Sequence, residues 1–101
     1  MKALLKRVGQ EAEVVEIENT LGALQSAVGG YIETLGVFPG IVAVVDEEGL
    51  LKVKTPNIAP NGILLVGDVV FVGVVGENFR SLTDEEVERL KLYSKLWEVK
   101  Q

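Results

Sequence analysis

The 101-residue chain contains no histidine and no cysteine. Histidine is the side chain that titrates near neutral pH, and the cysteine thiolate serves as a nucleophile and as a zinc ligand. Thiol catalysis and disulfide bonds are therefore excluded. We also expect no zinc site, no other bound metal and no cofactor.

Long apolar runs are missing as well. The longest are residues 63–67 and 69–75, which Asp68 separates. Neither run approaches the roughly 20 residues that a membrane-spanning helix needs. Three basic residues interrupt the first eight positions, which leaves no room for the apolar segment of a signal peptide. We therefore expect a cytoplasmic protein that has no membrane segment.

The composition is acidic, with 15 Asp and Glu residues against 10 Lys and Arg residues and a net charge of -5. Proteins that bind the phosphate backbone use clustered Lys and Arg side chains, so we expect no direct binding of nucleic acids. Hydrophobic residues make up 48% of the chain, which suffices for one core at this length. Residues 1–101 are therefore predicted to form a single globular domain.

Short segments with alternating or continuous apolar residues predict that much of the chain forms β-strands. Turns rich in Gly, Pro and Asn separate these segments. The strongest strand signal is the last, and the one before Asp46 is apolar on both faces, as in a central strand. The expected strands are residues 3–8, 13–17, 31–35, 41–46, 50–54 and 69–75.

Capping signals predict two helices. Thr20 is a good N-cap residue, apolar residues follow it at helical spacing, and the glycine pair that begins at Gly29 ends the segment. Thr83 and Glu86 form a capping box at the start of the second helix. The apolar stripe of that helix, within residues 87–99, is broad, so the helix is expected to bury a wide face.

The resulting order, β-β-α-β-β-β-β-α with short connections, favours an α+β fold with an antiparallel or mixed sheet. We expect both helices to lie on one face of this sheet. A ubiquitin-like β-grasp is the alternative topology, because it also opens with a hairpin followed by a helix.

Three residues of the central region are candidates for binding a ligand or partner. Lys52 and Lys54 project from the same face of an expected strand, where they could meet an anion; lysines also protect exposed strand edges. Asn57 lies between two prolines and could line a pocket or serve as a turn residue.

Two further candidates, Asn78 and Arg80, precede the last helix. The arginine could clamp a phosphate or a carboxylate, or it could pair with Asp84 or a loop carbonyl. Asp68 and Glu77 bracket the strongest strand and could form an acid pair, but acids at strand ends are usually solvated. We therefore expect no enzymatic activity and no catalytic residues.

Three segments carry a resemblance to a known family: IENTL at 17–21 with GGYIE at 29–33, then Pro56-Asn57, then GENFRSLTDE at 76–85. In this order and spacing they resemble domain-of-unknown-function family 3846, small proteins of phages and their bacterial hosts. An arginine follows the middle Asn in the family pattern, whereas Ile58 stands here, which argues against anion binding by that loop. The resemblance implies an accessory protein of a phage or mobile element in the bacterial host cell.

Two functions fit these observations. The first is binding of a host protein, for instance to modulate host defence, and the second is sequestration of an anionic ligand such as a nucleotide signal between subunits. Convergence of Lys52, Lys54 and Arg80 on one concavity would favour the ligand, and scatter would favour the protein partner. The broad apolar stripe also predicts a homodimer, formed through a sheet edge or the last helix.

Overall fold

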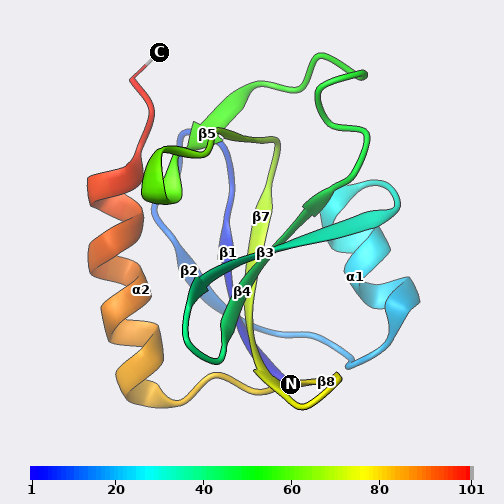
Figure 1. Ribbon diagram of the computed structural model, residues 1–101, viewed down its shortest axis with the longest axis vertical. Helices are drawn as coiled ribbons and strands as arrows, with labels where there is room; N and C mark the ends of the chain where they lie inside the picture. Colours follow the sequence, from blue (N-terminus) through cyan, green and yellow to red (C-terminus); the bar gives the residue numbers. More distant parts are fainter. Residues whose placement is uncertain (101) are drawn as a thin grey trace.

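A computed structural model describes residues 1–100, which form an antiparallel sheet with one helix on each side (Figure 1). The strand order is β2-β1-β7-β4-β3, and β8 pairs with β7 outside this path. The strands of this sheet are β1 (Lys2–Lys6), β2 (Glu13–Glu16), β3 (Ile32–Phe38), β4 (Ile41–Asp46), β7 (Val69–Val75) and β8 (Asn78–Arg80). The helices are α1 (Leu21–Val28) and α2 (Asp84–Trp97), and β5 (Pro56–Ile58) pairs with β6 (Leu65–Val66) across the 3-10 turn Pro60–Gly62.

Strand β7 lies at the centre of the sheet. It pairs with β1, β4 and β8, and its residues 69–73 are buried. The α+β class and the predicted element order are confirmed. Every strand pairing among residues 1–100 is antiparallel, so the sheet is not the mixed sheet of a ubiquitin-like grasp.

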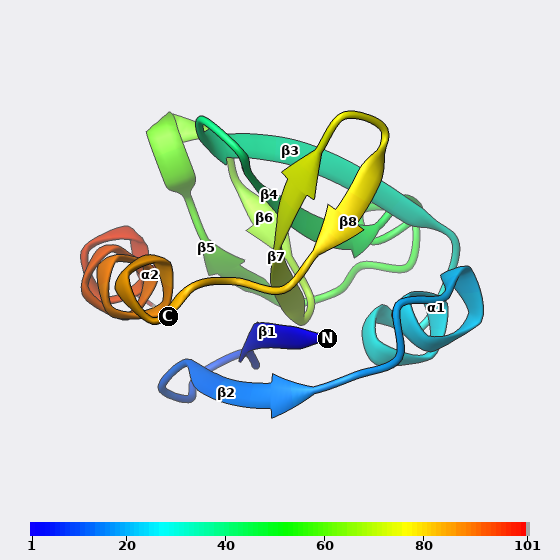
Figure 2. The same cartoon turned by 90° about the horizontal axis from the view of Figure 1, so that it is seen from below.

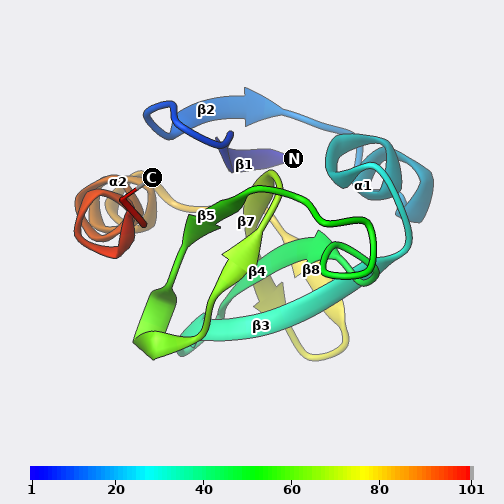
Figure 3. The same cartoon turned by 90° about the horizontal axis from the view of Figure 1, so that it is seen from above.

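The two helices lie on opposite faces of the sheet, as Figure 2 and Figure 3 show. Side chains alternate along a strand: Val69 and Phe71 belong to the core under α2, whereas Val70 and Val72 belong to the core under α1. The prediction that both helices cover one face is therefore wrong. Strands β4 and β7 are apolar on both faces, so each face needs its own cover.

Residues 50–53 form turns and residue 54 lies outside any strand, so the predicted strand is wrong there. Local backbone bonds close this segment: the amide of Lys52 donates to the carbonyl of Glu48, and the amide of Lys54 donates to that of Gly49. Val53 has a φ of 54°, in the left-handed region that a continuous strand does not use. Lys52 and Lys54 therefore do not project from a strand face.

Both predicted helix starts are confirmed. The Thr20 hydroxyl accepts from the amide of Ala23, and Gly29 ends α1 in the left-handed conformation. Thr83 and Glu86 form the complete capping box of α2. No helix among residues 1–100 is long and apolar enough to cross a membrane.

The cap of α2 gives a first prediction. The Thr83→Ala variant should lose about 1 kcal/mol of unfolding free energy, because an orphan amide of the first helical turn loses its acceptor. Urea denaturation measures the change, and Thr83→Ser, which keeps the hydroxyl, is the control. Equal stability of the Thr83→Ala variant and the unmodified protein would contradict the role of the cap.

Candidate functional site

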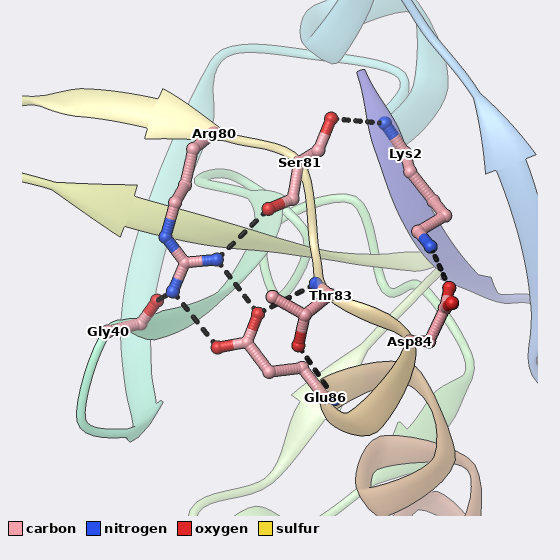
Figure 4. Close-up of polar contacts among 7 residues, drawn as sticks. All are labelled: Lys2, Gly40, Arg80, Ser81, Thr83, Asp84 and Glu86. Carbon is pink, nitrogen blue, oxygen red and sulfur yellow. Dashed lines mark hydrogen bonds and ion pairs between the residues drawn. The ribbon is translucent and has the colours of Figure 1, made fainter.

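Arg80 is held by partners within the fold, at the start of α2 (Figure 4). Its two terminal nitrogens donate to the two carboxylate oxygens of Glu86 at 2.8 and 2.9 Å. They also donate to the backbone carbonyls of Ser81 at 3.0 Å and Gly40 at 3.2 Å. A bidentate pair of this kind uses the fork of the guanidinium fully. Arg80 is therefore half-buried and its charge is paired within the fold, so it is not a free cation.

Glu86 and Asp84, both in the first turn of α2, pair with different cations. Sequence reasoning considered Asp84 as the partner of Arg80, but Asp84 instead pairs with Lys2 of β1 (Figure 4). The Arg80 guanidinium lowers the pKa of Glu86 to about 2 despite its partial burial, with help from the amide of Thr83. Lys2 likewise lowers the pKa of Asp84. Both carboxylates are thus charged near neutral pH.

Gly73 makes the position of Arg80 possible, because the two residues are cross-strand partners on β7 and β8. A Cβ atom on Gly73 would lie 2.6 Å from the central carbon of the guanidinium. A Gly73→Ala variant should displace Arg80 and raise the pKa of Glu86 from about 2 toward its ordinary value. A carbon-detected NMR titration measures this pKa. The control is Gly36→Ala, where a Cβ would meet no atom within 4 Å. An unchanged Glu86 pKa in Gly73→Ala would contradict this account of Arg80.

A second ionic cluster surrounds Asp46, the buried last residue of β4. The Nζ atoms of Lys52 and Lys54 each lie 2.8 Å from one carboxylate oxygen, and the amide of Glu48 donates to the other at 2.9 Å. Hydrogen bonds from Lys52 and then Lys54 lower the pKa of Asp46 against the opposing effect of burial. The same contact raises the pKa of Lys52.

The two lysines also bind the end of α1. Lys54 donates to the carbonyl of Val28 at 2.7 Å, and Lys52 donates to that of Gly29 at 3.1 Å. Cations are favourable at this end of a helix because the last carbonyls are unpaired and the helix dipole is negative there. The lysines therefore tie residues 47–54 to α1 and to Asp46, and both charges are engaged inside the fold.

Asn57 lies in a third, separate place and is buried. Its amide donates to the backbone carbonyls of Lys6 at 2.8 Å and Gly67 at 2.9 Å, and its oxygen accepts from the Lys6 ammonium at 2.9 Å. Lys6 also pairs with Glu98 at 3.0 Å. Sequence reasoning missed Lys6. Lys6 follows Leu4 by two residues on β1 and therefore lies on the same face of the strand, which was the signal that it points inward.

The predicted site residues do not come together. Asn78 is the exposed first residue of β8, and Arg80, the last residue of β8, contacts the first turn of α2. Lys52 and Lys54 contact the end of α1. Within residues 1–100, no three acidic side chains stand in positions that could hold a metal ion. The polar candidates are thus distributed over the molecule, mostly as internal contacts.

Exposed apolar side chains lie on α2 and beside β3, among other places. On α2, Leu92 and Leu96 are 59% and 70% exposed. A groove of about 250 Å³ lies beside β3. We call it the β3 groove; its lining comes from residues 33–35, 45–47, 50 and 63–66.

These features define an α+β protein with an antiparallel sheet, a helix on each face and its buried charges paired within the fold. The family model described as domain of unknown function (DUF3846) matches residues 1–97. The chain belongs to this family, which confirms the resemblance carried by the three segments. No curated protein and no solved structure matches the chain.

Proposed function

We propose that this protein is a non-catalytic accessory protein of a phage or mobile element that acts by binding a host protein. The observation that supports this proposal most is the internal engagement of Lys52, Lys54 and Arg80 at two separate places. A site for an anionic ligand needs cations that converge and are free to bind it. To serve a nucleotide, these side chains would have to leave Asp46 and Glu86.

Exposed apolar side chains also support a protein partner. Leu92 and Leu96 on α2, and Leu50 and Leu64 at the β3 groove, are exposed although they are large and hydrophobic. Contiguous apolar surface with a polar rim is typical of protein interaction sites. Binding through such a surface requires no catalytic group, which is consistent with a chain that lacks His and Cys.

Site-specific photo-crosslinking in host cells tests the proposal. A photoreactive residue at position 64 should give a discrete adduct with one host protein, whereas the same residue at the exposed, charged position 88 should not. The complex should then form again from the two purified proteins. A host protein that fails to bind in purified form would contradict the proposal, as would turnover of an ester, phosphodiester or glycoside substrate that one carboxylate substitution abolishes.

Self-association is a separate prediction. We expect a homodimer that buries the Leu92 and Leu96 face of α2, since two-fold dimers are the commonest closed assemblies. Light scattering should report twice the monomer mass of 10.9 kDa. A Leu96→Glu variant should be monomeric, and Glu88→Gln on the same helix should remain dimeric. A monomer at micromolar concentration for the unmodified chain would contradict the dimer.

A further inference from the structure

Strand β3 ends the sheet, so one of its edges has no partner strand among residues 1–100. The carbonyl of Tyr31 accepts from the amide of Glu47 at 2.8 Å, so these two residues form a hydrogen-bonded pair between the antiparallel strands. In an antiparallel pair only every second residue bonds to the partner strand. The intervening residues Ile32, Thr34 and Gly36 therefore direct their backbone amides and carbonyls away from β4. This edge carries unpaired groups of the kind that accept another strand.

Exposed apolar side chains lie beside this free edge. Leu50, Ile63 and Leu64 line the β3 groove and are 74%, 50% and 46% exposed. The strand order places β3 at the end of the sheet, with β4 as its neighbour. Backbone pairing and apolar contact are thus available to the same extended segment, since alternate side chains of an added strand would point into the groove.

The rim of the groove is negatively charged. Glu33 and Glu47 line it, and neither has a cation within ion-pair distance among residues 1–100. The nearest lysines of the 47–54 segment are already engaged by Asp46. The uncompensated charge of this groove is therefore acidic, and it complements a basic occupant.

We propose that the β3 groove receives an extended segment of a partner protein in which every second residue points into the groove, and in which these groove-facing residues include both apolar residues and Lys or Arg. The segment adds to the sheet as a strand beside β3, its apolar side chains contact Leu50 and Leu64, and its basic side chains meet Glu33 and Glu47. Main-chain bonds supply affinity in this mode of recognition, and the side chains supply specificity.

Charge argues against a second copy of this chain as the occupant. Pairing β3 with itself would bring together two edges that each carry Glu33, in a molecule whose net charge is -5. Like charges across paired strands are unfavourable. The inference rests on the proposed function, because it identifies the kind of host segment that is bound.

An NMR titration of the isotope-labelled full chain tests the inference. The probe, called the Val-Lys peptide, is an acetylated and amidated peptide of about eight residues, a common strand length. Every second residue is Val or Lys in turn, so that both kinds point into the groove, and the residues between them are Thr. The amide signals of Ile32, Thr34 and Gly36 should shift, and their exchange with solvent deuterium should slow by at least about tenfold at saturation. Methylation of alternate peptide nitrogens should abolish binding, because it removes the donors of the new ladder.

Charge variants give the matched controls. The Glu33→Lys, Glu47→Lys double variant should bind the Val-Lys peptide about tenfold more weakly or worse, and Glu88→Lys on α2 should bind it unchanged. A Val-Glu peptide, with Glu in place of each Lys, should bind the double variant more tightly than the unmodified protein. Urea denaturation of each variant establishes that it folds.

The inference is overturned by signal shifts confined to α2 or β2, by equal affinity for the Val-Lys and Val-Glu peptides, or by no binding at millimolar peptide. It is also overturned if the β3 signals shift with protein concentration alone, which would make a second copy the occupant. These failures leave the proposed function intact where a crosslinked host protein binds elsewhere on the surface. If the host complex does not form from the purified proteins, both the inference and the proposed function are contradicted.

Discussion

Truncation of Trp97 to alanine should lower the unfolding free energy by about 3 kcal/mol, the lower end of the range for large aromatic residues in cores. Trp97 is half-buried at the end of α2, and its ring centroid lies 5.4 Å from Tyr93, 5.9 Å from Phe38 and 6.2 Å from Phe71. These contacts fasten the last turn of the helix to β3 and β7. The variant loses both apolar burial and the ring contacts.

Urea denaturation provides the measurement, and Leu96→Ala is the control on the same turn. Leu96 is exposed in the monomer, so its truncation should cost less than about 0.5 kcal/mol when measured at a concentration below any dimerisation. If the Trp97 variant also lost little stability, α2 would not be docked on the sheet through this residue.

Replacement of Asp46 by asparagine should have the next largest effect, a loss of about 2 kcal/mol at neutral pH. Removing one member of a buried ion pair commonly costs about 3 to 5 kcal/mol. Here Lys52 and Lys54 retain access to water and to the α1 carbonyls, which reduces the cost. The asparagine keeps the shape of the side chain and an acceptor for the amide of Glu48.

The pH dependence of stability distinguishes this charge effect from a packing effect. The folded protein lowers the pKa of Asp46 below its ordinary value of 3.8, so the stabilisation is present above that value. It is lost as the pH falls below 3.8, because the unfolded state then binds a proton that the folded state does not. Stability of the Asp46→Asn variant should fall less steeply in this acid range, whereas Glu48→Gln should follow the unmodified protein. Identical slopes for all three would contradict the paired state of Asp46.

The elements that depend on local sequence were predictable. Thr20, Gly29 and Thr83 act through neighbours within a few residues, so the helix ends follow from the sequence alone. The apolar runs of β4 and β7 likewise identified buried strands. Those same runs are apolar on both faces, so each face of the sheet needs a helix to cover it. The prediction that both helices lie on one face overlooked this requirement.

The partners of the candidate site residues were harder to predict from the sequence. Lys52 and Lys54 alternate with apolar neighbours as in a strand, but contacts with Asp46 and with the end of α1 hold them outside any strand. The α1 carbonyls are over twenty residues away in the sequence, and a strand pattern does not show that the chain turns back to Asp46. The sequence analysis left open whether Arg80 binds an anion or pairs with Asp84 or a loop carbonyl. The capping box had already placed Glu86 at the start of α2, within reach of Arg80.

We propose that the protein binds a protein partner, while Lys52, Lys54 and Arg80 serve the fold. A thermal-shift titration with mono-, di- and cyclic nucleotides tests this claim most directly. A ligand at one hundred times its dissociation constant stabilises a fold by about 2.7 kcal/mol, which raises the melting temperature of a domain this size by about 10 °C or more. The account predicts an unchanged melting temperature across the panel at millimolar nucleotide. A rise that grows with nucleotide concentration, and that disappears in a Lys52→Gln, Lys54→Gln variant that still folds, would contradict it.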